Sequence, residues 1–319
     1  MKILVVQNRM GIGDMVIFLP FIEAISKKYN TPVNILVKEN TKASEFLQNN
    51  KYIEKIIILE RDNNLERHKN IKGFFNLIND IKKYNFNKIF IFNSSLRFYL
   101  ISKLAGIKEI YQYPLFEKKR QHIILTAKKF LKKILNEEIE SNPKISIDKN
   151  KVDLAKEKYQ IDENKLNIVL GIGGSGNTKR IPSNIFLKFM KLCSNKYNCN
   201  FFLATGIKKE EEEILKDILN SEFKKNCYSL AELKINDILP IIKNCKIAVC
   251  NDSSFSHLSA AVGLKTIVLM ADTPLIYGNY SPKMYPILPD GKTNVTHNTL
   301  GKEKINAEKI FNKLVEILN

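Results

Sequence analysis

The alternation of short apolar runs with longer amphipathic segments constrains the fold of this chain more than any other feature. Runs with strand character lie at residues 2–7, 33–37, 56–59, 88–92, 167–171, 200–204, 247–250 and 266–269. Between them, segments such as 15–29, 71–83, 184–197 and 209–219 show the apolar spacing of helices. Strands that alternate with helices of this length predict right-handed βαβ units and parallel sheets.

The pattern passes through two cycles, which a polar segment at residues 137–151 separates. We therefore expect an α/β protein with two Rossmann-like parallel-sheet domains, at residues 1–150 and 151–319, that face a central cleft. A chain of 319 residues is long enough for two domains with a core each. Ligands of open α/β sheets bind beyond the carboxyl ends of the strands, so the informative residues are those that follow each strand.

Composition narrows the class of protein. No apolar run approaches the roughly 20 residues that span a bilayer, and the opening MKILVV is too short for a signal-peptide core, so we expect a cytoplasmic protein. The five cysteines show no C-x-x-C spacing and are expected to be reduced thiols. Only four histidines are present, none near a cysteine pair, and we expect no metal site.

The charge balance favours an anionic partner. Lys and Arg number 51 against 33 Asp and Glu, a formal net charge of +18. Charge alone is compatible with nucleic acid, an anionic membrane surface or a phosphorylated substrate. The aromatic residues lie mostly inside apolar runs and are not interleaved with basic ones as on a single-strand binding surface, so we expect no nucleic acid.

The first strand is followed by Gly11-Ile12-Gly13-Asp14. The two glycines suggest a dinucleotide fingerprint, but Val16 stands where the third glycine is needed, which makes that match weak. Asp14 at a helix start is a candidate general base. Its structural alternative is an N-cap, for which Asp is a preferred residue.

A glycine-rich loop at residues 171–182 follows the first strand of the second cycle. Gly173, Gly174 and Gly176 would let backbone N–H groups approach an anion closely, and Lys179 and Arg180 could supply cations for phosphate. The loop does not match the Walker A pattern. The alternative is a flexible surface loop.

A third polar loop, Asn251-Asp-Ser-Ser-Phe-Ser-His257, lies between an apolar strand and a helix of small residues. Free backbone N–H groups at the start of that helix, together with the helix dipole, would bind a phosphate or carboxylate. An ordinary Asp or Ser N-cap is the alternative. His257 and a further polar turn at Asp272 and Thr273 favour the binding site.

Taken together, these loops resemble those of the family 9 glycosyltransferases, the lipopolysaccharide heptosyltransferase group, over nearly the whole chain. Gly11 to Asp14 match the family's small-Leu-Gly-Asp motif, Gly173–Ser175 with Lys179–Pro182 match its P-G-x-S and K-x-W-P loop, and Asp252–His257 match its D-[ST]-G-x-x-H signature. The chain departs from the pattern at Ser254, which replaces glycine, and at Ile181, which replaces tryptophan. Asp272 and Thr273 are exchanged relative to the family's G-P-T-D-P turn.

The resemblance implies the GT-B fold and an inverting glycosyltransferase that moves heptose from ADP-heptose to a lipopolysaccharide-core or related glycan acceptor. It makes Asp14 the base that deprotonates the acceptor hydroxyl. Asp252 would hold sugar hydroxyls and Glu210 the nucleoside ribose, although Glu210 could instead belong to an acidic first helical turn. The departing diphosphate would be stabilised by Ser175, Lys179, Ser253, Ser254 and His257. No metal or cofactor is expected. The last helix, at residues 306–318, is expected to be structural, and in GT-B proteins it commonly crosses back to the first domain.

The acceptor side is indicated by a basic amphipathic segment at residues 117–135, in which Lys128 and Lys132 lie opposite the apolar residues. Such a helix could bind a phosphorylated glycolipid or the anionic cytoplasmic face of the inner membrane. The alternative is that its apolar side packs on a core.

Three other functions stay open from sequence. The chain could transfer a different nucleotide sugar, bind a nucleotide sugar without turnover, or act as a sugar-nucleotide epimerase on the same fold.

Overall fold

The computed structural model describes residues 1–61, 66–115 and 122–319. The chain forms two compact units, Met1–Pro143 and Lys144–Asn319. The boundary therefore follows Pro143, whereas the sequence suggested residue 150. Ile145 explains the difference, because its backbone N–H donates to the Ala261 carbonyl 2.8 Å away and so ties the connecting segment to the second unit.

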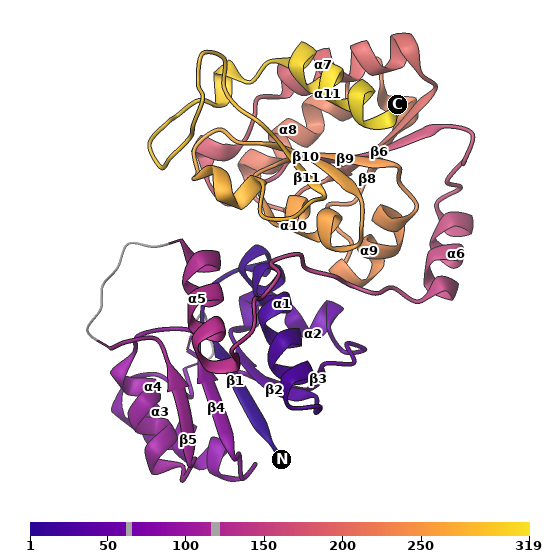
Figure 1. Ribbon diagram of the computed structural model, residues 1–319. Helices are drawn as coiled ribbons and strands as arrows, with labels where there is room; N and C mark the ends of the chain where they lie inside the picture. The colour runs from indigo at the N-terminus through magenta and orange to yellow at the C-terminus, as the bar shows by residue number, and fades with distance from the viewer. Residues whose placement is uncertain (62–65, 116–121) are drawn as a thin grey trace. The chain divides into compact units, whose positions relative to one another are not determined.

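The first unit is a five-stranded parallel sheet in the order β3-β2-β1-β4-β5. Its strands are β1 Ile3–Gln7, β2 Val33–Val37, β3 Ile53–Ile58, β4 Lys88–Ile91 and β5 Glu109–Gln112. Its helices are α1 Ile12–Lys28, α2 Ala43–Phe46, α3 Asn70–Lys82, α4 Leu96–Leu104 and α5 Ile123–Leu135. Helices lie on both sides of the sheet (Figure 1), which is why β1 and β2 are buried along their whole length.

The second unit is a six-stranded parallel sheet in the order β11-β10-β9-β6-β7-β8. Its strands are β6 Leu166–Gly171, β7 Cys199–Ala204, β8 Cys227–Ser229, β9 Ile247–Asn251, β10 Lys265–Leu269 and β11 Met284–Ile287. Its helices are α6 Lys149–Lys158, α7 Ser183–Lys196, α8 Lys209–Leu219, α9 Ile235–Lys243, α10 Ser254–Ala261 and α11 Ala307–Leu318. The predicted α/β class with two parallel sheets is confirmed.

Helix α11 is the last helix that the sequence predicted. Ile310, Leu314 and Ile317 are buried in the core of the second unit, where α11 packs against α7 (Figure 1). Its role within this unit is therefore structural. None of the helices in the described ranges is long and apolar enough to cross a membrane.

Strand order creates one switch point in each sheet. In the first unit it lies between β1 and β4, because β2 and β3 extend the sheet beyond β1 and β5 extends it beyond β4. In the second unit it lies between β6 and β9, with β7 and β8 beyond β6 and β10 and β11 beyond β9. At such a point the loops after neighbouring strands lead to opposite faces of the sheet and leave a crevice between them. All three loops that the sequence singled out follow one of these strands.

Close contact between β6 and β9 leads to a stability prediction. A Cβ at Gly171 would lie 2.6 Å from the Cys250 Sγ and 2.7 Å from the Cys250 Cβ. We expect Gly171→Ala to lower the free energy of unfolding by about 1–3 kcal/mol in urea titrations, the usual cost of overpacking. Combining it with Cys250→Ala, which removes the Sγ, should recover part of the loss.

Gly176→Ala is the control, because its nearest neighbour atom would lie at 3.6 Å, an ordinary contact. Equal losses from the two glycine substitutions would contradict the steric explanation.

Candidate functional site

The loops after β6 and β9 meet at the switch point of the second unit, and Asn251 joins them. This last residue of β9 is fully buried. Its Nδ2 donates to the carbonyls of Ile172 at 2.8 Å and Gly173 at 3.2 Å, and its Oδ1 accepts from the Ile181 N–H at 3.4 Å. One amide side chain thus fixes both ends of the glycine-rich loop.

The centre of this loop is held by two charged side chains. The Gly174 N–H donates to Oε1 of the buried Glu211 at 2.7 Å, and an Arg180 guanidinium nitrogen donates to the Gly174 carbonyl at 3.0 Å. The sequence suggested Arg180 as a phosphate ligand. In the structure, one nitrogen of its guanidinium group instead supports the loop. A Cβ at Gly173 would lie 2.6 Å from the Glu211 Oε1, so this position has no room for a side chain. The loop is therefore built into the fold, unlike the flexible loop that the sequence left open.

Asp252 is the centre of the charged cluster in this unit. Its carboxylate is buried, and Oδ2 lies 3.2 Å from Lys179 Nζ and accepts a hydrogen bond from the Thr273 hydroxyl. The other oxygen, Oδ1, lies 3.9 Å from His257 Nε2. Burial of a carboxylate is costly unless it is paired, and Lys179 with Thr273 provides that pairing.

His257 is held as a neutral ring. Burial lowers the pKa of His257 to about 4; the carboxylate of Asp252 opposes this shift, and the charge of Lys179 adds to it. Its Nδ1 lies 2.9 Å from the hydroxyl oxygen of Tyr280, whose ring centroid is 5.6 Å away. A neutral imidazole carries one N–H, so this ring can donate a hydrogen bond without adding charge.

Helix α10 begins beside this cluster. Ser253 is its N-cap residue, yet its hydroxyl makes no capping bond, and the buried Oγ has no hydrogen-bond partner among the described residues. Ser254 is the first helical residue and is half-buried. The first N–H groups of a helix have no partner within the helix, so this end presents backbone donors next to Lys179. The alternative from sequence was an ordinary N-cap, but the side chain of Ser253 does not make the hydrogen bond of such a cap.

The polar turn after β10 also has a clear structure. Thr273 points to Asp252, whereas the Oδ1 of Asp272 accepts from the Leu300 N–H at 2.8 Å. Burial alone would raise the pKa of Asp272, but hydrogen bonds from the Leu300 amide, the Thr178 hydroxyl and neighbouring amides lower it. The exchange of Asp and Thr thus places the hydroxyl in the charged cluster and the carboxylate on a neighbouring loop.

Asp14 belongs to the first unit and lies in the first turn of α1 after β1. The N-cap of α1 is Gly11, with φ +97°, so Asp14 is not the cap that the alternative reading required. Its Oδ1 lies 3.3 Å from the Arg9 Nε, and 22% of its side chain is exposed. Gln7, the buried last residue of β1, accepts the Arg9 N–H at 3.0 Å and so positions this turn.

The other sequence candidates differ in their surroundings. Ser175 is exposed on the glycine-rich loop, and Glu210 is exposed on the first turn of α8. The neighbouring Glu211, which sequence reasoning missed, is the carboxylate that reaches the loop.

Helix α5 packs on α1 through its buried residues Ile124, Ala127, Leu131 and Leu135, as the structural alternative for this segment required. The Lys132 ammonium is ion-paired with Glu138, and Lys128 is half-buried. Residues 117–121 of the predicted basic segment lie outside the described ranges.

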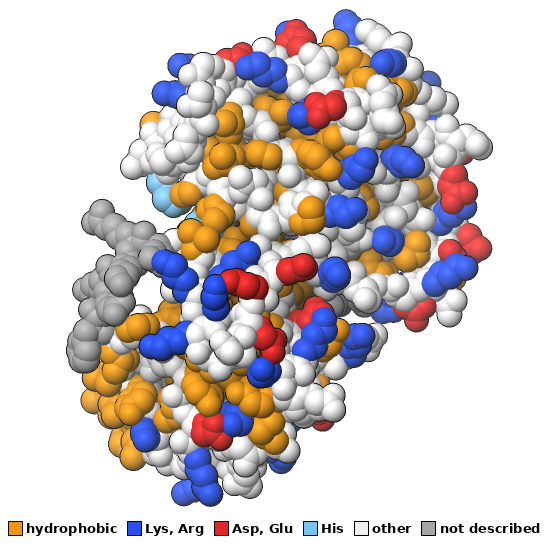
Figure 2. All heavy atoms as spheres, viewed as in Figure 1, with side chains coloured by type: hydrophobic (Ala, Val, Ile, Leu, Met, Phe, Trp, Pro, Cys, Tyr) orange, Lys and Arg blue, Asp and Glu red, His pale blue; other side chains and the backbone are white. Residues whose placement is uncertain are grey.

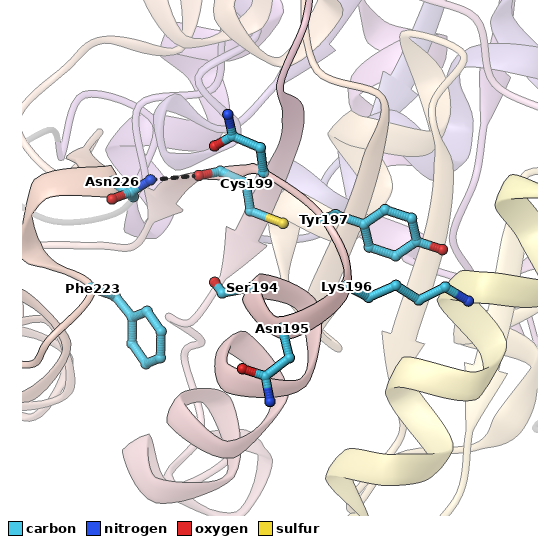
Figure 3. Close-up of a pocket in the computed structure, with 8 residues that line it drawn as sticks. Ser194, Asn195, Lys196, Tyr197, Cys199, Phe223 and Asn226 are labelled. Atoms are coloured by element: carbon cyan, nitrogen blue, oxygen red, sulfur yellow. Dashed lines mark hydrogen bonds between the residues drawn. The ribbon is translucent and has the colours of Figure 1, made fainter.

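A pocket of about 470 Å³ lies at the opposite end of the second sheet (Figure 3). Its lining includes Tyr197 and Cys199, at the end of α7 and the start of β7, and Phe223 and Asn226, in the segment before β8. It therefore lies at the amino ends of the strands. The charged cluster and the glycine-rich loop follow the carboxyl ends, so this pocket is separate from the candidate site.

Comparison with known proteins places these features in a family. Residues 110–314 match glycosyltransferase family 9 (heptosyltransferase). The chain is 22% identical to lipopolysaccharide heptosyltransferase 1 of Campylobacter coli, with 93% of this chain and 92% of the relative covered.

Solved structures agree on the fold. A family 9 glycosyl transferase from Veillonella parvula DSM 2008 is similar with a TM-score of 0.80 at 17% identity, over 99% of this chain and 97% of that one. The E. coli heptosyltransferase WaaC with ADP-2-deoxy-2-fluoro heptose gives a TM-score of 0.70 at 14% identity over 100% of both chains. The two parallel sheets are those of the GT-B heptosyltransferases. Since the family match spans well over half of the chain, the protein belongs to glycosyltransferase family 9, the heptosyltransferase family.

Proposed function

We propose that this protein transfers heptose from ADP-heptose to a lipopolysaccharide-core acceptor, with inversion at the anomeric carbon. The observation that carries the proposal is the anion-binding arrangement at the β6/β9 switch point. There a glycine-rich loop, Lys179 and the start of α10 converge around a buried, paired carboxylate, Asp252.

The donor would bind with its diphosphate against this arrangement. Lys179 supplies a positive charge, while Ser175 and the backbone N–H groups at Ser253 and Ser254 supply hydrogen bonds. Negative charge accumulates on the diphosphate as its bond to the sugar breaks, so donors fixed in advance lower the barrier. Asp252 would hold sugar hydroxyls through the oxygen that is not shared by Lys179 and Thr273.

Two observations support ADP-heptose as the donor. The WaaC structure named above contains an ADP-linked fluoro-heptose, and the Campylobacter coli relative is a lipopolysaccharide heptosyltransferase. The departures from the family pattern at Ile181 and Ser254 are compatible with a working site. Ile181 is fully buried in the core of the second unit, and the backbone N–H of Ser254 is retained whatever its side chain.

In this proposal Asp14 is the general base. Its carboxylate takes the proton of the acceptor hydroxyl as that oxygen attacks the anomeric carbon, and the electron pair of the broken bond leaves with ADP. Attack from the side opposite ADP gives inversion. Phosphate groups of the acceptor would contact Lys128 and Lys132. The ion pair of Lys132 with Glu138 lies at the surface and is weak, so it would not prevent this contact.

Glu211 acts on the donor indirectly, through the loop. Its carboxylate and the Arg180 guanidinium grip the N–H and the carbonyl of Gly174. A loop fixed in this way loses little conformational entropy when the donor binds. We assign loop positioning to Glu211 and retain Glu210 as the candidate for contact with the nucleoside.

His257 would contribute an uncharged donor to the diphosphate. Its depressed pKa keeps the ring neutral at pH 7, so its hydrogen bonding does not change across the physiological range.

The first prediction concerns the proposed chemistry. With ADP-heptose and a lipopolysaccharide-core acceptor, Asp14→Asn should lower kcat by about 10²–10⁴-fold, the usual contribution of a general base. The Kd for ADP, measured by calorimetry, should be unchanged, because Asp14 does not belong to the donor-binding unit. Wild-type turnover with GDP- or UDP-sugars but not with ADP-heptose would overturn the choice of donor.

Glu23→Gln is the matched control for Asp14→Asn. Glu23 is a second carboxylate on α1, paired with Lys27 at 2.6 Å, and its loss should leave kcat unaltered.

The second prediction compares adjacent glutamates. Glu211→Ala should weaken ADP binding about tenfold, which corresponds to about 1.4 kcal/mol, and should lower the Tm because the buried Gly174 N–H loses its acceptor. Glu210→Ala should leave the Tm unchanged because Glu210 is exposed, and its effect on ADP affinity reports the nucleoside contact. A lower Tm in Glu210→Ala but not in Glu211→Ala would show that Glu210, and not Glu211, supports the loop.

The third prediction concerns pH. The folded pKa of His257, about 4, is below the ordinary value of 6.5, so between these values the unfolded chain binds a proton that the folded chain does not. Stability from the neutral ring is therefore full above pH 6.5 and lost as the pH falls towards 4. In urea titrations between pH 7.5 and 5, His257→Gln should show a smaller loss of stability than wild type.

His297→Gln, at an exposed histidine, should keep the wild-type dependence. Parallel pH curves for wild type and His257→Gln would show that His257 does not titrate as stated.

A further inference from the structure

Helices α3 and α4 expose apolar side chains on their outer sides. Ile71 and Phe75 on α3, and Leu96, Leu100 and Leu104 on α4, are between 43% and 78% exposed. Their spacings of four residues place each set on one side of its helix. The helices pack against each other, and Figure 2 shows hydrophobic side chains gathered in the region where Figure 1 places them. We call these five side chains the α3–α4 face.

The exposed apolar residues are additional to those with which α3 and α4 pack on the core. The same two helices bury Leu77, Ile78, Ile81, Phe98 and Ile101 in the core of the first unit. Each helix therefore carries large apolar residues on its exposed side in addition to those in the core, whereas a helix at the surface of a soluble domain is normally polar on its outer side. A contiguous apolar area of this kind marks a contact surface.

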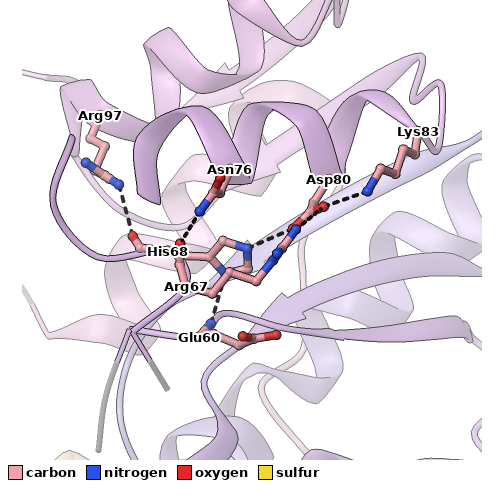
Figure 4. A network of polar contacts seen from close by, with 7 residues as sticks. All are labelled: Glu60, Arg67, His68, Asn76, Asp80, Lys83 and Arg97. Atoms are coloured by element: carbon pink, nitrogen blue, oxygen red, sulfur yellow. Dashed lines mark hydrogen bonds and ion pairs between the residues drawn. The ribbon is translucent and has the colours of Figure 1, made fainter. Parts of the chain in front are cut away.

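The charges on these two helices are almost all positive. Lys72, Lys82 and Lys103 are exposed and Arg97 is half-buried, while Asp80 is the single acidic residue of α3 and α4. The Asp80 carboxylate faces Arg67 at 2.9 Å, Lys83 at 2.9 Å and His68 at 3.1 Å (Figure 4). Burial raises the pKa of Asp80, but hydrogen bonds from Lys83, His68 and Arg67 outweigh it and bring the value to about 2. The negative charge is thus neutralised locally, and the face presents lysines around apolar side chains.

The same polar network ties both helices to the segment before α3. The Glu60 N–H donates to His68 Nδ1 at 3.0 Å, so Nε2 of His68 carries the proton and donates to Asp80. An Arg97 guanidinium nitrogen donates to the His68 carbonyl at 3.0 Å and links α4 to the segment before α3 (Figure 4). Gly73 fits directly against the His68 backbone, where a Cβ would lie 2.1 Å from the carbonyl carbon. Both helices are fixed without help from a partner.

We propose that the α3–α4 face docks on the surface of an anionic phospholipid bilayer. Apolar side chains would enter the boundary between headgroups and acyl chains, and lysines near the surface would be attracted to anionic lipid. A second copy of this chain fits less well, because it would bring the same exposed lysines to the contact and is itself strongly basic, with a formal net charge of +18. The proposal does not depend on which sugar the protein transfers.

Co-sedimentation of the full-length protein with vesicles tests the proposal. Wild type should bind vesicles of phosphatidylethanolamine and phosphatidylglycerol at least tenfold more strongly than phosphatidylcholine vesicles, and added salt should weaken the binding. Phe75→Ser combined with Leu100→Ser should lower the partition coefficient about tenfold. Lys72→Ala combined with Lys103→Ala should reduce both the binding and its dependence on salt.

Two control variants locate the surface. Leu154→Ser removes an exposed leucine from α6 in the second unit and should bind as wild type does. Lys128→Ala combined with Lys132→Ala removes the basic side of α5 and should retain most of the binding. Circular dichroism and the Tm should be unchanged in every variant, because the altered side chains do not lie in the cores.

Three results would overturn the proposal. They are an absence of wild-type binding to anionic vesicles, loss of binding only when the α5 lysines are removed, and concentration-dependent dimerisation that Phe75→Ser with Leu100→Ser abolishes. The last result would assign the face to a second copy of the chain.

Discussion

The close approach of β6 to β9 is the constraint on which the site of the second unit depends. Gly171 leaves room for Cys250, and one residue later Asn251 joins the end of β9 to both ends of the glycine-rich loop by three hydrogen bonds. This contact keeps the glycine-rich loop beside the start of α10. Without this contact, the loops that carry Lys179 and Asp252 would not be held together. Each side chain would then be exposed to water, where its electrostatic interactions are weaker.

The buried carboxylates of this site have partners within the protein before any ligand arrives. The buried carboxylates of Asp252 and Glu211 each have a specific partner, Lys179 for the first and the Gly174 N–H for the second. His257 avoids the cost of a buried charge by staying neutral. The same rule operates in the first unit, where Asp80 is neutralised by its neighbours.

Much of the architecture could be predicted from sequence, because strands buried on both faces and helices of ordinary length give clear periodicity. The three informative loops were found since each one directly follows such a strand. Glu211 was missed because four consecutive glutamates follow Lys209 at the start of α8, and only the rotation of the helix decides which of them points inward. Asn251 and Tyr280 act through partners that are far away in sequence. The α3–α4 face was also hidden, because the apolar residues of α4 are spread around the helix and its sequence does not show which of them are covered.

At the proposed donor site, the ion pair between Lys179 and Asp252 would have a consequence for selectivity. Any anion that binds at Lys179 competes with a carboxylate that is already 3.2 Å from the ammonium group. A ligand with one negative charge gains little from that exchange, since it replaces one such contact with another. The diphosphate of the proposed donor would bring several charged oxygens and could bind the lysine and the amides at the start of α10 together, so the internal pair would act as a filter against simple cellular anions.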